Sequence, residues 1–167
     1  VTGVLCAWQD GIPLVVISGQ NFLRETTRYT GVGVRTYGQQ EADIIELVKP
    51  ITKYAQMLEK ASDVTKIMEE AISIAKSGRK GPVFIDIPLD LQSALIDVEE
   101  SSFEFKDDIN GEDSDNFIKS KDIDDVKAAF EEAERPVILI GKGISHSNTS
   151  SELRQFSESI GIPVTFA

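Results

Sequence analysis

The segment of residues 78–92 constrains the fold of this chain more than any other part of the sequence. A turn of glycine and basic residues leads into the apolar run 83–87, and Pro88 halts that run. A short apolar run between turn residues is typical of a parallel strand that is buried on both faces. Because a helical pattern precedes the run and ends at Gly78, the segment predicts an α/β fold.

The first 97 residues continue this alternation of helices and strands. Apolar runs predict strands at 14–17 and 54–58, and helical spacing predicts helices over 1–10, from about 39 to Lys49, and from an N-cap at Asp63 to Gly78. Ser18, Gly19 and Gln20 end the first strand. Ligands usually bind at the carboxyl ends of parallel strands, so this tripeptide is expected near any binding site.

A long polar loop is predicted over residues 21–38, with a short helix at its start. The loop carries Arg24, Arg28 and Arg35 together with three glycines. Loops of this length in compact domains are often functional. The three arginines are therefore interpreted either as a clamp for an anionic group or as plain surface charges.

Acidic residues are concentrated in the middle of the chain. Residues 97–125 hold twelve Asp and Glu side chains and three Lys, within a net charge of −11. This pattern predicts a solvated acidic linker over 98–121, between a first domain at 1–97 and a second at 122–167. The acidic balance argues against nucleic-acid binding, which favours a basic face.

The second domain has a helix, strand, helix, strand pattern of Rossmann-like character. Residues 137–140 predict another buried strand, and residues 163–166 predict the next. Between them, Gly141, Lys142 and Gly143 form either a nucleotide-binding turn or a plain tight turn. The third glycine of the dinucleotide fingerprint is absent, so the phosphate signal is weak.

No apolar run approaches the about 20 residues of a membrane span. Cys6 is the single cysteine and is expected to be buried. These features predict a cytoplasmic protein without membrane partners. The first residues begin inside a helical pattern, so we expect a fragment, and an organellar targeting segment before Val1 stays open.

Several blocks of sequence together resemble one enzyme family. The blocks are residues 1–3, 10–20, 40–41, 49–53 and 78–92. Their order and spacing are similar to the pyrimidine-binding domain of thiamine diphosphate-dependent enzymes, in the acetolactate synthase branch. Residues 122–167 resemble the start of the central domain of the same enzymes. The resemblance implies a partial thiamine diphosphate-binding fold followed by a partial Rossmann-like domain.

The resemblance also implies an activity. Family members use thiamine diphosphate and Mg²⁺ to decarboxylate a 2-keto acid, and they ligate or release the resulting aldehyde unit. They are homodimers or homotetramers, and some bind FAD or an ADP-like group in the central domain. The activating Glu of the family is expected before Val1, and the metal and diphosphate motif beyond Ala167. No catalytic or metal-binding residue is therefore assigned in these 167 residues, which are expected to be inactive alone.

Site residues carry over from the family at a few positions. Gln39 and Gln40 match a Phe-Gln pair that binds substrate in acetolactate synthases. Leu89 stands where the family has Lys, and it is expected at the entrance together with Arg24, Arg28 and Arg35. Gly141, Lys142 and Gly143 are the candidate nucleotide-binding turn. Gln39 and Leu89 depart from the family pattern, which predicts a different donor or acceptor.

Two other functions stay open. The first is a related reaction on the same fold, catalysed by an acyl-CoA lyase or a sulfo-acid acetyltransferase. The second is a noncatalytic assembly or regulatory role. The presence of a Glu at the activating position upstream would separate catalysis from the second of these.

Overall fold

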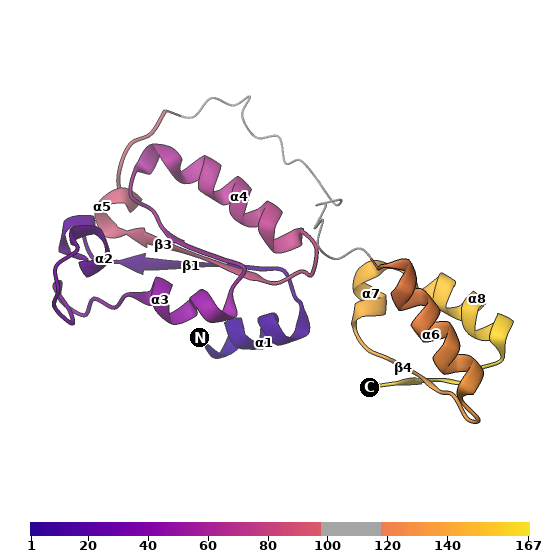
Figure 1. Cartoon of the computed structure of the whole chain (residues 1–167). Coiled ribbons are helices and arrows are strands. Elements are labelled where there is room, and N and C mark those ends of the chain that lie inside the picture. The colour runs from indigo at the N-terminus through magenta and orange to yellow at the C-terminus, as the bar shows by residue number, and fades with distance from the viewer. Residues whose placement is uncertain (98–117) are drawn as a thin grey trace. The chain divides into compact units, whose positions relative to one another are not determined.

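The computed structural model describes residues 1–97 and 118–167, which fall into two compact units (Figure 1). Most of the predicted acidic linker, residues 98–117, lies outside the described residues. Its last two residues belong to a helix, because α6 begins at Ser120. In the described part of the chain, no helix is both long enough and apolar enough to cross a membrane.

A parallel three-stranded sheet in the order β1-β3-β2 forms the centre of the first unit. The strands are β1 Leu14–Gln20, β2 Tyr54–Met57 and β3 Pro82–Pro88. Central strand β3 is almost wholly buried, which confirms the prediction drawn from its apolar run. Strand β1 is longer than predicted, because residues 18–20 stay paired with the end of β3.

Helices cover both faces of this sheet, with α4 on one face and α1 and α3 on the other (Figure 1). The helices are α1 Thr2–Asp10, α3 Ile44–Val48, continued by η2 Lys49–Ile51, and α4 Val64–Lys76, preceded by η3 Ala61–Asp63. Successive residues of β3 point to opposite faces: Phe84 packs on the α1 and α3 side, and Val83 and Ile85 pack on the α4 side. The α/β fold predicted from the sequence is confirmed.

Helix α4 is held by its apolar stripe and by its carboxyl end. Ile67, Ala71 and Ala75 are buried at helical spacing, as predicted. Lys53 Nζ donates hydrogen bonds to the carbonyl oxygens of Ile74 and Ser77, at 2.5 and 2.6 Å. The Ile74 carbonyl also accepts hydrogen bonds from the backbone N–H and the hydroxyl of Ser77, at 3.3 and 3.0 Å. A cation at this end of the helix also interacts favourably with the helix dipole.

Three local predictions differ from the structure. Helix α3 begins at Ile44 rather than near residue 39, because Asp43 caps it by accepting a hydrogen bond from the Glu46 backbone N–H. Asp63 precedes α4, but its side chain makes no capping bond. Cys6 is exposed, because α1 buries Val4 and Ala7 and turns Cys6 to solvent.

The loop after β1 contains two short helices, and a further short helix follows β3. They are η1 Leu23–Glu25, α2 Thr27–Thr30 and α5 Leu89–Gln92. Thr26 is buried and caps α2 by accepting a hydrogen bond from the Tyr29 backbone N–H at 3.3 Å. The rest of the loop, residues 31–43, closes against the carboxyl end of β1, where the candidate site lies.

The described residues of the second unit form two parallel strands and three helices. They are α6 Ser120–Glu132, β4 Ile138–Ile140, α7 Gly143–Ser147, α8 Ser150–Ile160 and β5 Val164–Phe166. Helices α6 and α8 meet through the edge-to-face rings of Phe130 and Phe156, whose centroids are 6.2 Å apart. The strand predicted at 137–140 is present as β4, but its predicted burial is wrong, because Leu139 is 66% exposed. No element of the described unit covers the sheet face that carries Leu139.

Candidate functional site

A turn at residues 39–43 lies at the carboxyl end of the sheet, and it is tied to the sheet through a buried carboxylate. Asp86 on β3 is 1% exposed. It accepts a hydrogen bond from Ser18 Oγ at 2.5 Å and one from Gln20 Nε2 at 3.0 Å. The same Gln20 amide donates to the carbonyl oxygen of Ala42 at 2.8 Å. The central strand therefore anchors the turn through two side chains.

Burial raises the pKa of the Asp86 carboxyl above its ordinary value. The hydrogen bonds from Ser18 and Gln20 act in the opposite direction, because they stabilise the charged form. Burying a carboxylate without such donors is costly. The two donors therefore explain how an acidic residue is tolerated in the most buried strand of the unit.

A second buried carboxylate, Glu41, ties the turn to the loop before it. Glu41 is 4% exposed, and its Oε1 accepts hydrogen bonds from the backbone N–H and the hydroxyl of Thr27, both at 2.6 Å. Its Oε2 accepts a hydrogen bond from the Tyr37 backbone N–H at 2.8 Å. Burial by itself raises the pKa of Glu41, but these hydrogen bonds outweigh burial and lower the pKa below its ordinary value.

The remaining residues of the turn are also held. The Gln39 carbonyl accepts a hydrogen bond from Asn21 Nδ2 at 2.6 Å. Asp43 accepts a hydrogen bond from Arg28 Nε at 2.8 Å. Gln40, in the middle, has a φ of 61°, in the left-handed region that residues other than glycine rarely adopt. Residues in such conformations persist only where the surrounding structure holds them, and they are concentrated at functional sites.

The structure places some of the predicted site residues together. Gln39 and Gln40 have exposed side chains at the turn. Leu89 is 50% exposed, and its backbone N–H donates to the Asn21 carbonyl at 3.4 Å. Asn21 therefore contacts both Gln39 and Leu89, so the predicted substrate position and the predicted entrance lie at the same edge of the sheet.

The three loop arginines do not act alike. Arg28 forms ion pairs with Asp43 at 2.8 Å and Glu46 at 2.7 Å. The hydrogen bond to Asp43 is the main cause that raises the pKa of its guanidinium, which stays fully charged. Arg24 and Arg35 are exposed. Arg28 thus has a structural role in tying the loop to α3, and of the three arginines only Arg24 and Arg35 are exposed.

The sequence analysis did not predict the two buried carboxylates or the hydroxyl and amide groups that donate hydrogen bonds to them. One signal was present, because Asp86 interrupts a strand that is otherwise apolar and a buried charge requires partners. A second was the placement of Ser18 and Gln20 at the end of a strand. Glu41 carried no comparable signal, because its burial depends on how the loop closes.

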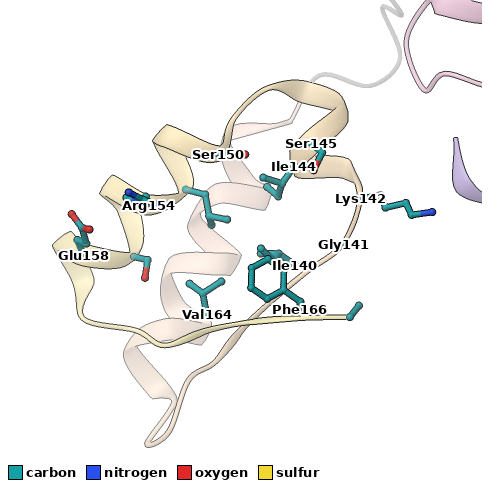
Figure 2. Close-up of a pocket in the computed structure, with 13 residues that line it drawn as sticks. Ile140, Gly141, Lys142, Ile144, Ser145, Ser150, Arg154, Glu158, Val164 and Phe166 are labelled. Atoms are coloured by element: carbon teal, nitrogen blue, oxygen red, sulfur yellow. The ribbon is translucent and has the colours of Figure 1, made fainter. Parts of the chain in front are cut away.

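A cavity of about 510 Å³ lies in the second unit, at the carboxyl ends of β4 and β5 (Figure 2). Its lining includes Ile140, Gly141, Lys142, Leu153, Arg154 and Phe166. The Lys142 side chain extends away from Ile140 and Phe166 (Figure 2). The first two residues of the predicted nucleotide-binding turn therefore border this cavity, while Gly143 begins α7.

The chain is similar in sequence to known proteins. Residues 123–167 match the sequence family described as the central domain of thiamine pyrophosphate enzymes. The acetolactate synthase large subunit of Buchnera aphidicola subsp. Acyrthosiphon pisum (strain APS) is 37% identical over 168 residues, covering 99% of this chain and 27% of that protein. The probable acetolactate synthase large subunit of Methanocaldococcus jannaschii is 34% identical over 167 residues, covering 98% of this chain and 26% of that protein.

A solved structure shows the same fold. The crystal structure of benzoylformate decarboxylase from Polynucleobacter necessarius matches with a TM-score of 0.67 at 21% identity, over 98% of this chain and 28% of that chain. Residues 123–167 therefore resemble the central domain of thiamine pyrophosphate enzymes, and the whole chain is similar to acetolactate synthase large subunits. The chain is acetolactate synthase-like in sequence, and it spans about a quarter of the length of the curated relatives it matches.

Proposed function

We propose that the whole protein is a thiamine diphosphate- and Mg²⁺-dependent enzyme that decarboxylates a 2-keto acid and then ligates or releases the aldehyde unit. The observation that carries this proposal is the turn at residues 39–43. It holds Gln40 in a strained conformation at the carboxyl end of the sheet, at the position where the family resemblance implies substrate binding.

We propose that the metal and diphosphate site lies outside the described residues, as the family resemblance implies. Among residues 1–97 and 118–167, no group of three or more His, Cys, Asp or Glu side chains is arranged to hold a metal ion. Asp86 and Glu41 are buried and occupied by protein donors. We therefore assign no step through the cofactor to these residues and restrict their role to the substrate side.

Gln40 is proposed to bind the 2-keto acid through its side-chain amide. An amide can donate a hydrogen bond to a carboxylate or a carbonyl oxygen of the substrate. Gln39 lies beside it and offers a second amide where the family has an aromatic ring. Leu89, Arg24 and Arg35 are proposed to border the entrance to the substrate site. Gln39 in place of an aromatic residue and Leu89 in place of Lys support a donor or acceptor substrate other than that of acetolactate synthase.

The second unit is proposed to contribute a nucleotide site, with FAD or an ADP-like group in the cavity beside Gly141 and Lys142. Its volume of about 510 Å³ is within the range of small-molecule sites. We further propose domain limits at residues 97 and 122, a cytoplasmic homodimer or homotetramer, and no nucleic-acid or membrane partner.

Turnover by the full-length protein tests the function. The protein is incubated with thiamine diphosphate, Mg²⁺ and pyruvate or a longer 2-keto acid, while CO₂ and the carbon product are measured. We expect CO₂ release together with either a ligated hydroxyketo acid or a free aldehyde. Absence of CO₂ from every 2-keto acid would contradict the proposal, and product formation from an acyl-CoA or a sulfo-acid would favour the related reactions.

A pair of variants locates the substrate site. Gln40→Ala is expected to raise the KM for the 2-keto acid at least about tenfold, because it removes the proposed donor to the substrate. Gln9→Ala, which removes an exposed amide on α1, is the matched control and is expected to leave KM unchanged. An equal effect of the two substitutions would remove Gln40 from the site.

A further inference from the structure

We propose that Glu41 is a positioning residue for the reaction: its buried carboxylate locks the backbone around Gln40, and so sets where the Gln40 amide meets the substrate. This inference rests on the proposed function, since it needs Gln40 to bind substrate. It adds a residue to which the family resemblance assigns no role. It stands on the geometry of the loop, on the burial of Glu41 and on the conformation of its neighbour.

The first step is that Glu41 uses both of its carboxylate oxygens. Oε1 accepts from the backbone N–H and the hydroxyl of Thr27, and Oε2 accepts from the Tyr37 backbone N–H. Thr27 and Tyr37 lie at opposite ends of the exposed part of the loop. The Glu41 side chain thus holds both Thr27 and Tyr37, and Glu41 directly follows Gln40 in the chain.

The second step is that Gln40 needs such support. Its φ of 61° is unfavourable for a residue with a side chain, so an unrestrained turn would leave this conformation. The neighbours on both sides are held, because Asn21 binds the Gln39 carbonyl and Gln20 binds the Ala42 carbonyl. Glu41 supplies the remaining constraint, adjacent to Gln40 itself.

The third step is that an ionised carboxylate suits this place and its amide analogue does not. The donors that face Glu41 are the backbone N–H and the hydroxyl of Thr27 and the backbone N–H groups of Tyr37 and Gly38, and a carboxylate has acceptor sites for all of them. In Glu41→Gln one oxygen becomes an NH₂ group, which would face the N–H of Thr27 or Tyr37. The substitution keeps the shape of the side chain, but it breaks at least one arm of the clamp.

The experiment compares Glu41→Gln, Gln40→Ala and the double variant in the full-length enzyme. Glu41→Gln is expected to raise the KM for the 2-keto acid about tenfold and to leave kcat within about threefold. In the Gln40→Ala background the same substitution should have no further effect on KM, because Glu41 acts through Gln40. The matched control is Glu59→Gln, which removes an exposed charge from the same unit.

A readout independent of turnover is amide hydrogen exchange of the full-length protein. The amides of Thr27 and Tyr37 should exchange faster in Glu41→Gln than in the wild type. In Glu59→Gln their exchange rates should equal those of the wild type. Thr27→Val is a milder second variant, because it removes only the hydroxyl donor and keeps the backbone donor. It is expected to raise KM in the same direction by a smaller factor, and it serves if Glu41→Gln fails to fold.

The outcomes separate the two proposals. No turnover of any 2-keto acid by the wild-type enzyme would overturn the proposed function, and the inference with it. Turnover by the wild type, with Glu41→Gln leaving KM unchanged or adding its full effect to Gln40→Ala, would overturn the inference alone. Loss of the KM effect in the Gln40→Ala background, with faster exchange at Thr27 and Tyr37, would support it.

Discussion

Replacing Gly38 by alanine should disrupt the turn that holds Gln40. A Cβ at this position would lie 2.6 Å from Asn21 Nδ2 and 2.7 Å from the backbone oxygen of Glu25. Carbon-to-oxygen contacts at about 3.3 Å or more are comfortable, so the new methyl group overlaps both neighbours. Asn21 can rotate away only by giving up its hydrogen bond to Gln39, and the Glu25 carbonyl belongs to the short helix η1.

The cost follows from these two contacts. Overpacking of this kind typically costs about 1–3 kcal/mol. The lost hydrogen bond from Asn21 adds about 0.5–1.5 kcal/mol. We therefore expect Gly38→Ala to lower the free energy of unfolding of the first unit by about 2–4 kcal/mol. Gly33, in the same loop, has no atom within 4 Å of the corresponding Cβ position. Gly33→Ala should change stability by less than about 0.5 kcal/mol.

Urea unfolding of the chain measures the difference, with the fluorescence of Trp8 as the probe. Trp8 is the only tryptophan of the chain and lies in α1, so its signal reports on the first unit. The free energy of unfolding is compared among the wild type, Gly38→Ala and Gly33→Ala, provided that it depends on urea concentration with the same slope in all three. Equal free energies of unfolding for the two alanine variants would refute the reasoning. Such a result would mean that Asn21 and Glu25 accommodate the new methyl group without loss of stability.

Three further predictions concern the two buried carboxylates and the end of α4. Because the folded pKa of Asp86 is raised, its stabilising contribution is fully present below its ordinary value of 3.8 and is lost as pH rises through the folded pKa. Asp86→Asn should remove this pH-dependent loss of stability. Parallel pH profiles of the unfolding free energy for the wild type and Asp86→Asn would contradict the prediction. Glu41 has the opposite sign: its contribution is present above 4.5 and is lost as pH falls through its lowered pKa. Lys53→Met should cost about 1–3 kcal/mol in urea unfolding, since it removes charged donors to the end of α4. Lys66→Met, at an exposed position of the same helix, is its control and should be near neutral.

Local patterns in the sequence were sufficient to predict the central strand β3 and the buried face of α4. The apolar run at 83–87 predicted the central strand β3, and the stripe of Ile67, Ala71 and Ala75 predicted the buried face of α4. Gly11 and Gly161 follow their helices in the left-handed conformation, which is common for glycine at a helix C-terminus. These signals are short in range, because each depends on residues within a few positions of one another.

Burial failed as a prediction where it depends on neighbouring elements. The run at 137–140 has the same composition as a buried strand, but Leu139 is exposed, since burial of a strand requires an element on each face. Cys6 was expected inside for its residue type, whereas the orientation of α1 against the sheet turned it outward. Composition alone does not determine which side of an element meets another.

The sequence by itself therefore determined the α/β class, the central strand and the likeness to thiamine diphosphate-dependent enzymes. The tertiary structure alone decided that Asp86 meets Ser18 and Gln20, which are 68 and 66 residues away along the chain. That meeting follows from the register of β1 against β3, which places Ser18 opposite Asp86. The burial of Glu41 was decided in the same way, by closure of a loop whose donors become neighbours only after the chain has folded.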